Sequence, residues 1–467
     1  MIPMVLSEIA MVTGGEIIQG DPGAKFSAVS TDTRAAREGD LFFALRGEHY
    51  NAHNFLDQAV NAGAGGLVIS HRVELPPEIP VLLVGDTLSA LQSLASVNRA
   101  RSGAFLVGVT GSTGKTTTKD MIASVLETRF RLIKTTGNLN NEIGMPLTLL
   151  KIGKDTEVAV VEMAMRGSGE IDSLCRIAKP DGAVITNINE THLELLGDVS
   201  NIAAAKGEIL EHIPPEGFAL LNSGSPYIRR EAGRCRGRVI YFGSDQAADI
   251  RAENTRTDTG GSTFNVVAGG ECYTCYIPVP GRHNVLNSLA AVGVGREMGL
   301  ADEEIARGLT AVVLTGMRLE VMNCNGLKII NDTYNASPAS TRAALQTLAD
   351  LAGERRKIAV LGNMLELGPR ALEGHKEIGE TAAGLDLAGL VTVGDLAAAI
   401  YNGAIGAGFP AEKAHQCPDN NEAAGVLKKL LQAGDVVLVK GSRGMKMEQI
   451  VVQLIKSWDD FKQQQTS

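Results

Sequence analysis

The sequence predicts an α/β protein of three domains, each built around a largely parallel sheet. The chain has 467 residues, which at roughly 150 residues per domain suggests about three hydrophobic cores. Short apolar runs of strand length alternate with helical stretches over most of the sequence, as in sheets joined by helical crossovers. A glycine-rich turn with Lys-Thr follows one central strand. We therefore predict domains over residues 1–102, 103–315 and 316–467.

The first range mixes short strands with helices. Strands are expected over residues 41–45, 66–69 and 81–84. After the turn-rich segment Leu75-Pro76-Pro77, a helix over residues 87–99 leads to the next apolar run. These elements predict a small α/β domain.

The second range opens with the most informative segment of the chain. An apolar run over 104–109 precedes a turn spelled Gly-Ser-Thr-Gly-Lys-Thr-Thr, and a helix over 119–128 follows. Strand, glycine-rich turn, Lys-Thr and helix form the layout of a phosphate-binding loop, in which backbone N–H groups hold phosphate. Val109 replaces the glycine of the strict consensus, so the loop is a G-x-x-G-K-T variant. The predicted nucleotide contacts are Gly111, Ser112, Thr113, Gly114, Lys115, Thr116 and Thr117.

Ionisable side chains follow the next strands of this range. Glu162 ends the strand over 158–161, at the sheet edge where a magnesium ligand is expected. His192 follows the strand expected over residues 183–187, and Lys206 lies in the helical stretch beyond it. Their order indicates a metal site beside the phosphates. The absence of an N-K-x-D tetrapeptide disfavours a GTPase.

The remainder of the chain contains a hairpin-rich stretch and a second α/β unit. Residues 249–280 are polar and rich in threonine and glycine, and we expect them to form an insertion that interrupts the central sheet. Beyond them, strands over 327–330, 358–362, 390–393 and 436–440 alternate with helices over 339–352, 372–384, 421–432 and 445–457. This alternation predicts an open, Rossmann-like domain.

The bulk composition limits the possible partners. A net charge of −9 argues against general binding to nucleic acid or to anionic membranes. No stretch approaches the roughly 18 apolar residues that span a bilayer. The first residues lack the basic region of a secretory signal. We expect a cytoplasmic monomer that acts on small molecules.

Several further motifs, taken together, resemble those of the Mur ligases, the ATP-dependent amino-acid and peptide ligases of peptidoglycan synthesis. The phosphate loop and the segments around Glu162, His192 and Lys206 resemble the central domain of that family. The other matching segments are residues 30–34, 39–45, 135–146, 281–287, 317–320, 331–338 and 440–443. Within the family, the chain is most similar to ligases that join D-alanyl-D-alanine to UDP-N-acetylmuramoyl-tripeptide (UDP-MurNAc-tripeptide).

This resemblance implies a role for each matching residue. The first domain would bind the uridine nucleotide, the central domain would be a P-loop ATPase-type sheet, and the Rossmann-like domain would complete the ligase. The implied catalytic residues are Lys115, Glu162, His192 and Lys206, and the implied Mg²⁺ ligands are Thr116, Glu162, His192 and a carbamylated Lys206. For ATP, Asn284 and Asn287 would contact adenine, Arg318 phosphate and Asp332 ribose. The implied substrate contacts are Thr33, Arg34, Asn138, Asn141, Tyr334, Asn335, Ser442 and Arg443.

The resemblance also implies a reaction and a motion. ATP would phosphorylate a carboxylate, and an amine would then displace phosphate from the acyl phosphate. Because the ATP contacts are divided between two domains, we expect domain closure with hinges near residues 100–103 and 314–317. Two positions depart from the family pattern, since Asn51 and Asn363 stand where aspartate is usual.

Three other functions remain open on the sequence. A related ligase would add a single amino acid at the dipeptide stage, and a folylpolyglutamate synthase would share the later domains. A nucleotide-switched regulatory protein would use the phosphate loop without ligase chemistry. Such a switch would not require the set of Glu162, His192 and Lys206.

Overall fold

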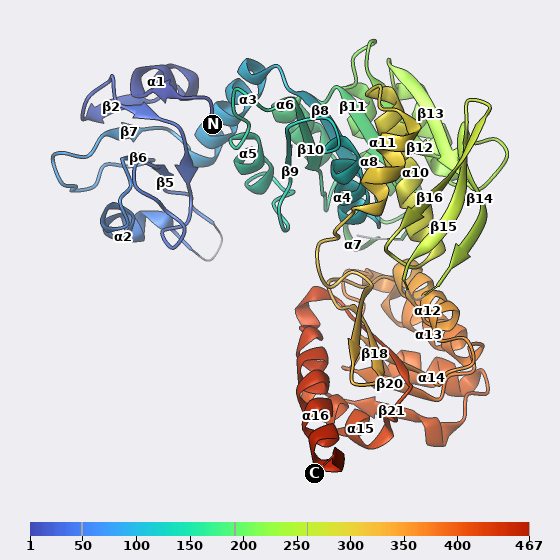
Figure 1. Ribbon diagram of the computed structural model, residues 1–467. Coiled ribbons are helices and arrows are strands. Elements are labelled where there is room, and N and C mark those ends of the chain that lie inside the picture. The colour runs from blue at the N-terminus through green and yellow to red at the C-terminus, as the bar shows by residue number, and fades with distance from the viewer. Residues whose placement is uncertain (48–49, 191–192, 259, 467) are drawn as a thin grey trace.

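The computed structural model describes residues 1–47, 50–190, 193–258 and 260–466. Within these residues, sheets of five, nine and six strands follow one another along the chain. Figure 1 shows them as three bodies, with the first in blue, the second in green and yellow, and the third in orange and red. The predicted α/β class is confirmed. The domain boundaries near residues 102 and 315 stay a prediction.

The first body is a small sheet with helices. Its strands pair in the order β2-β7-β6-β5-β4, and β1 and β3 form a separate pair. Its elements are β1 (Met4–Val5), α1 (Leu6–Thr13), β2 (Glu16–Gln19), β3 (Lys25–Phe26), β4 (Val29–Ser30), β5 (Leu41–Phe43), α2 (Leu56–Asn61), β6 (Gly66–Ile69), β7 (Val81–Leu83) and α3 (Thr87–Ser102). Strands β5 and β6 are fully buried, which agrees with their unbroken apolar sequences.

The central sheet has the order β16-β15-β14-β13-β12-β11-β8-β10-β9. Its elements are β8 (Phe105–Thr110), α4 (Lys115–Leu126), β9 (Leu132–Lys134), α5 (Gly144–Leu149), β10 (Val158–Glu162), α6 (Glu170–Ala178), β11 (Gly182–Ile185), α7 (Leu193–Leu196), α8 (Val199–Glu211), β12 (Phe218–Asn222), α9 (Pro226–Glu231), β13 (Arg238–Gly243), β14 (Ile250–Thr257), β15 (Ser262–Ala268), β16 (Glu271–Ile277), α10 (Arg282–Glu297) and α11 (Asp302–Thr310). Strands β10 and β11 both run parallel to β8 and flank it on opposite sides, so the strand order reverses at β8, the position where open α/β sheets bind ligands.

Two details of this region differ from the sequence predictions. Helix α4 begins at Lys115 rather than at residue 119, since Gly114 takes a left-handed φ of 79° and the helix starts directly after it. The stretch over 249–280 does not interrupt the sheet. Strand β14 joins β13 in parallel, and β15 and β16 extend the same sheet as antiparallel strands.

The third body has the strand order β17-β18-β22-β19-β20-β21. Strand β17 is antiparallel to β18, and the other neighbours are parallel. Its elements are β17 (Glu320–Cys324), β18 (Leu327–Asp332), α12 (Pro338–Ala352), β19 (Lys357–Gly362), α13 (Ala371–Ala383), β20 (Gly389–Val393), α14 (Ala398–Gly406), β21 (Ala414–Cys417), α15 (Asn420–Leu430), β22 (Val436–Lys440) and α16 (Glu448–Thr466). The sequence patterns missed α14 and β21.

Helix α3 connects the first body to the central one. Asn98 near its end donates hydrogen bonds to the carbonyls of Leu149 and Ile152, and Arg99 pairs with Asp181 at 2.6 Å. At its start, Thr87 donates a hydrogen bond to the carbonyl of Ala44 in the first body. The expected hinge near residues 100–103 therefore falls at the end of a helix whose contacts reach both bodies.

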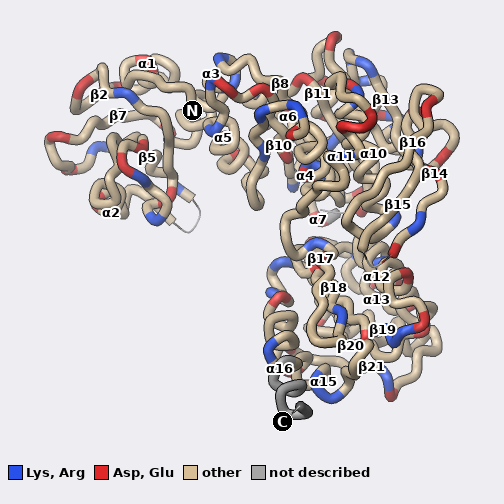
Figure 2. Tube along the Cα trace, viewed as in Figure 1, with Lys and Arg blue, Asp and Glu red and all other residues tan. Residues whose placement is uncertain are grey.

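Charge is distributed evenly over the molecule. Figure 2 shows Lys and Arg interspersed with Asp and Glu along all three bodies, without one extended basic stripe. Among the described residues, no helix combines the length and apolar character needed to cross a membrane.

Candidate active site

A cavity of about 690 Å³ opens between the central body and the third body. This volume lies within the range of small-molecule sites, roughly 300–1,000 Å³. The central body contributes the phosphate loop, Glu162 and the start of α10, and the third body contributes residues around the ends of β18 and β22. Among the described residues, none from the first body lines the cavity.

The phosphate loop crosses from β8 to α4 at the floor of the cavity. Its two glycines have left-handed φ angles, 143° at Gly111 and 79° at Gly114. A Cβ atom at Gly111 would lie 2.0 Å from Oγ1 of Thr186, and one at Gly114 would lie 2.6 Å from Oδ1 of Asn287. Both conformation and space therefore require glycine, and the missing side chains let an anion approach the backbone of the loop closely.

Side chains from the loop after β11 hold the phosphate loop in place. Oδ1 of Asn187 accepts the Thr113 N–H at 2.9 Å, and the Thr186 hydroxyl donates to the Thr113 carbonyl at 2.6 Å. The Ser112 hydroxyl donates to the carbonyl of Asn189 at 3.0 Å. The sequence motif did not assign these roles, although Asn187 stands at a predicted strand end.

Lys115 lies folded onto its own loop. Its Nζ donates to the carbonyls of Gly111 at 2.8 Å and Ser112 at 3.2 Å. Burial lowers the pKa of Lys115; Glu162 and Glu366 oppose this shift, and the nearby Arg318 guanidinium adds to it. Cations from two bodies thus lie close together.

Glu162 is fixed by two neighbours. The Thr116 hydroxyl donates to its Oε2 at 2.8 Å, and Nδ2 of Asn140 donates to its Oε1 at 2.8 Å. Thr116 and Glu162 thus meet at the edge of the sheet, as a shared magnesium site requires. From the Asn-Leu-Asn-Asn run, Asn138 and Asn141 were predicted to contact substrate, and Asn140 was not. All three line the cavity, and Oδ1 of Asn141 also accepts the Gly144 N–H at the start of α5.

Lys206 is among the most buried cationic side chains described, with 1% of its surface exposed. Burial lowers its pKa well below the ordinary lysine value, and Lys115 adds to that shift. Within the described residues, its ammonium group makes no hydrogen bond or ion pair. An amine in this environment favours its neutral form.

The second part of the expected metal site consists of His192 and Lys206. His192 lies outside the described residues. Within the described residues, no group of three or more His, Cys, Asp or Glu side chains could hold a metal ion. The donor set is nevertheless suited to Mg²⁺, because this ion keeps several waters and combines one or two carboxylates with substrate phosphates.

Asn284 and Asn287 lie on the first turns of α10 at the cavity wall. Nδ2 of Asn284 donates to the carbonyl of Pro280 at 2.7 Å, and Nδ2 of Asn287 donates to Oδ1 of Asn284 at 3.3 Å. The Oδ1 of Asn287 packs against Gly114 of the phosphate loop. Asn287 therefore contacts both Asn284, the other predicted adenine contact, and the phosphate loop.

The facing wall belongs to the third body. Arg318, Asp332, Tyr334 and Asn335 all line the cavity, as expected of an ATP and substrate site. The Arg318 guanidinium stacks 4.0 Å from the centre of the Tyr334 ring. Burial also lowers the pKa of His283, at the start of α10, to about 4, where Asp332 opposes and Lys440 adds to the shift.

Four of the predicted substrate residues do not line the cavity. Thr33 and Arg34 belong to the first body, and the Arg34 side chain is 88% exposed and paired with Asp32. Ser442 is buried, where its hydroxyl accepts the Leu365 N–H at 2.9 Å, and Arg443 pairs with Glu448 at the surface. Their predicted roles remain predictions.

Asn363 occupies one of the two positions that depart from the family pattern. Its Nδ2 donates to Oδ1 of Asp395 at 2.7 Å, and its Oδ1 accepts the Ala397 N–H at 2.9 Å. An aspartate here would place a second carboxylate against Asp395. Asn51, the other departure, accepts the His53 N–H at 3.1 Å. Each amide therefore has a structural use of its own outside the cavity.

Comparison with known proteins identifies the family. The model of the Mur ligase middle domain matches residues 109–295, and that of the Mur ligase glutamate ligase domain matches residues 317–443. A UDP-N-acetylmuramoyl-tripeptide–D-alanyl-D-alanine ligase of Bacillus subtilis is 42% identical over 431 residues, which cover 92% of this chain and 93% of that protein. The chain belongs to the Mur ligase family.

Solved structures agree with this assignment to the Mur ligases. A crystal structure of MurF from Acinetobacter baumannii matches with a TM-score of 0.89 and 32% identity, covering 97% of this chain and 99% of that one. MurF from Thermotoga maritima, solved in complex with ADP, matches with a TM-score of 0.82 and 30% identity over 93% of this chain and 98% of that one. The three-domain architecture of this Mur ligase is thereby shown.

Proposed function

We propose that this Mur ligase uses ATP and Mg²⁺ to join D-alanyl-D-alanine to UDP-MurNAc-tripeptide in peptidoglycan synthesis. One observation supports this most directly: Lys115 and Arg318 come from two bodies and both line a cavity floored by a phosphate loop, and the buried Lys206 lies close enough to Lys115 for the two charges to interact. A cavity lined by cations and free N–H groups fits a polyphosphate. The Bacillus subtilis relative is named for this ligation.

Each part of ATP has a matching surface. The loop from Gly111 to Thr117 would hold the phosphates, with Lys115 moving from its loop carbonyls onto the β- and γ-phosphate oxygens. Arg318 would contact phosphate from the facing wall, Asn284 and Asn287 the adenine, and Asp332 the ribose. The Thermotoga maritima structure, solved with ADP, supports a nucleotide in a protein of this fold.

Thr116 and Glu162 would hold Mg²⁺, with His192 and a carbamylated Lys206 as the proposed ligands of a second ion. When bound, Mg²⁺ neutralises phosphate charge in the transition state. Carbamylation suits Lys206 because a neutral amine adds CO₂ to give a carbamate and releases one proton. The burial that lowers the pKa of Lys206 supplies this neutral amine.

The reaction joins three reactants at one point. The tripeptide carboxylate attacks the γ-phosphorus, ADP leaves, and the amine of D-alanyl-D-alanine displaces phosphate from the resulting acyl phosphate. Two anions must approach each other in the first step, so the contribution of Lys115 and Arg318 is to neutralise charge and to orient the phosphates. Excluding water protects the acyl phosphate from hydrolysis.

The substrates would bring the three bodies together. We propose that Thr33 and Arg34 hold the uridine nucleotide and that Asn138 and Asn141 guide the peptide into the cavity. Tyr334, Asn335, Ser442 and Arg443 are the proposed contacts for D-alanyl-D-alanine. Closure would lower the radius of gyration measured by X-ray scattering with ATP analogue and acceptor, and an unchanged radius would contradict it. We also propose that the enzyme works as a monomer in the cytoplasm.

The decisive experiment offers each acceptor and amine in turn. Purified protein with ATP and Mg²⁺ should release phosphate only when UDP-MurNAc-tripeptide and D-alanyl-D-alanine are both present, and mass spectrometry should detect the pentapeptide product. Single amino acids with the UDP-linked dipeptide test the alternative ligase. Product from that pair alone would replace the proposal, and nucleotide hydrolysis without any ligated product would favour the regulatory function.

A further inference from the structure

The domain-crossing segment, residues 315–319, joins the central body to the third body and places Arg318 in the cavity. Its backbone is unusual. Met317 and Leu319, on either side of Arg318, have φ angles of 63° and 51°. Residues with a Cβ atom rarely adopt this left-handed region, and such a conformation persists only where surrounding contacts hold it.

The first end of the segment is bound to the helix that begins in the phosphate loop. Oδ2 of Asp120, on α4, accepts both the N–H of Thr315 at 2.9 Å and its hydroxyl at 2.8 Å. Oδ1 of the same carboxylate pairs with Nζ of Lys119 at 2.9 Å, and both side chains are buried. The segment therefore starts at a fixed point relative to Lys115.

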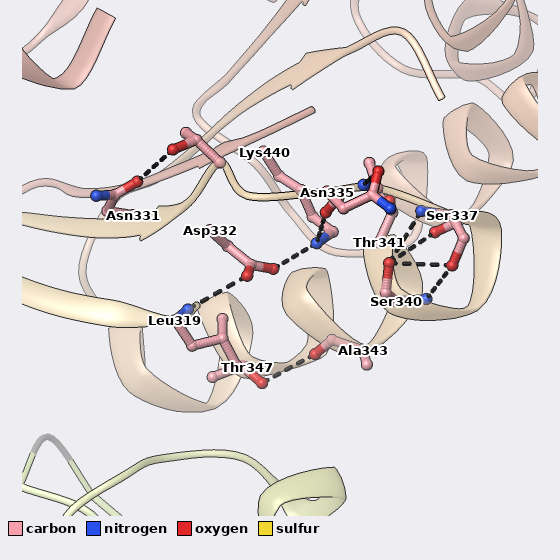
Figure 3. Close-up of polar contacts among 12 residues, drawn as sticks. Leu319, Asn331, Asp332, Asn335, Ser337, Ser340, Thr341, Ala343, Thr347 and Lys440 are labelled. Carbon is pink, nitrogen blue, oxygen red and sulfur yellow. Dashed lines mark hydrogen bonds and ion pairs between the residues drawn. The ribbon is translucent and has the colours of Figure 1, made fainter. Parts of the chain in front are cut away.

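The second end is bound to the sheet of the third body, as Figure 3 shows. Oδ1 of Asp332 accepts the Leu319 N–H at 3.2 Å, and Oδ2 accepts Nζ of Lys440 at 2.5 Å. Lys440 also donates to the carbonyl of Asn335 at 2.9 Å, and its side chain is 2% exposed. Asp332 and Lys440 are partners in the last register position of β18 and β22.

Arg318 lies between these two ends. Its Nε is buried without a hydrogen-bond partner among the described residues. The guanidinium rests on the Tyr334 ring, and the Tyr334 N–H donates to the carbonyl of Met317 at 3.2 Å. Lys440, through Asp332 and Asn335, thus supports both the segment and the residue on which Arg318 stacks.

We propose that Asp120 and Lys440 are positioning residues that hold Arg318 ready for the terminal phosphate of ATP. The inference rests on the proposed function and extends it to two residues outside the nucleotide contacts. A guanidinium that is already oriented loses little freedom on binding and needs little reorganisation as charge develops. At the first end the buried Asp120 carboxylate is paired with the buried Lys119, and at the second end the half-buried Asp332 carboxylate is paired with the buried Lys440, so each end is fixed by charge-assisted bonds.

Titration calorimetry of the full-length protein can test this through two ligands, ADP and a non-hydrolysable ATP analogue. The two share adenine, ribose and the first phosphates, so their affinity ratio reports the terminal phosphate alone. Lys440→Met should lower the preference for the ATP analogue by about tenfold, because it removes a charge-assisted contact. Thr315→Val, at the opposite end, should act in the same direction by about threefold, since it removes one hydroxyl bond. Lys428→Met, an exposed matched change on α15, should leave the ratio unchanged.

A double variant tests whether Lys440 acts on the affinity ratio through Arg318. In an Arg318→Ala background, Lys440→Met should lower the ratio no further, whereas independent actions would add. Equal weakening of both ligands by Lys440→Met would instead show that Lys440 serves Asp332 at the ribose, and it would overturn the proposal. An unchanged affinity ratio in both Lys440→Met and Thr315→Val would also overturn the proposal. Thr315→Val is included because Lys440→Met could cause a folding defect.

The product assay separates this inference from the proposed function. If the wild-type protein makes the pentapeptide product while both Lys440→Met and Thr315→Val keep the wild-type ratio, the positioning role alone is wrong. If no acceptor yields product, the ligase function is wrong whatever the ratio shows.

Discussion

The two walls of the cavity are prepared for their ligands in different ways. On the central wall, short bonds join side chains directly to the phosphate loop and to Glu162, and Asn140, Thr186 and Asn187 provide them. On the facing wall, the Nε of Arg318 has no hydrogen-bond partner within the described part of the chain, and the residue depends on a strained segment anchored at both ends. In the proposed function, the central wall would hold the phosphates in a rigid loop, and the third body would supply a cation from the opposite side. Changes to the central wall should therefore lower the reaction rate of ATP most strongly. Changes to the facing wall should mainly affect how the terminal phosphate is positioned between the two bodies.

The strongest way to break this comparison is to remove the central cation. Lys115→Ala should lower the ligation rate by about a hundredfold or more, since it removes a transition-state cation from the phosphates. Phosphate release measures the rate, and an unchanged thermal midpoint shows that the fold is intact. Lys154→Ala, at an exposed position of the same body, is the control. A rate within about threefold of wild type would place the phosphates elsewhere.

The next test concerns the buried lysine behind the loop. Lys206→Ala should lower activity by about a hundredfold, because an anionic ligand at the second Mg²⁺ is lost. Short carboxylic acids should restore part of the rate by occupying the vacated space. Rescue by acetate, but not by methylamine, would distinguish a carbamate from a free ammonium. If neither compound has an effect and Lys206→Ala retains full activity, the carbamate assignment is wrong.

A smaller effect should follow from the amide that orients Glu162. Among the described residues, Asn140→Ala leaves the Thr116 hydroxyl as the remaining hydrogen-bond donor to the carboxylate, and outer-shell partners of this kind typically contribute about tenfold or more in metal affinity. We expect the Mg²⁺ concentration for half-maximal activity to rise by about tenfold. Activity at saturating Mg²⁺ should change much less. Asn402→Ala, an exposed change on α14, should shift neither quantity.

The smallest effect concerns His283, where the two walls meet. Burial lowers its pKa to about 4, whereas an unfolded histidine titrates near about 6.5. Between these values the unfolded chain binds the proton and the folded chain does not, so stability falls as pH decreases from about 6.5 towards 4. His283→Gln should reduce this loss. Thermal midpoints at pH 7.5 and 5.0 measure it, and an identical drop in both proteins would contradict the assignment.

Much of the central wall could be predicted because its information is local. The loop from Gly111 to Thr117 is one continuous motif, and Glu162 directly follows an apolar strand. The facing wall was predicted only in part. Arg318, Asp332, Tyr334 and Asn335 do line the cavity, whereas Ser442 and Arg443 do not, because the Ser442 hydroxyl is buried against the Leu365 N–H and the Arg443 guanidinium pairs with Glu448 at the surface.

The error in the fold prediction also arises from contacts between segments that are distant in the sequence. The polar stretch over 249–280 has the composition of an insertion, but its strands find partners at the edge of the central sheet and extend it. Edge pairing depends on which backbone groups are left open by the rest of the sheet. A local sequence pattern does not indicate which backbone groups these are.

The sequence by itself determined the α/β class, the phosphate loop and the carboxylate beside it, since strand periodicity, glycine backbone freedom and strand ends are properties of a few adjacent residues. Tertiary structure decided which side chains hold them. Asn140 meets Glu162 across 22 residues, Lys440 meets Asp332 across 108, and Thr315 meets Asp120 across 195. Such pairs form only when separate strands and helices pack together, because each partner alone is an ordinary polar residue whose bonding is set by what the fold places next to it.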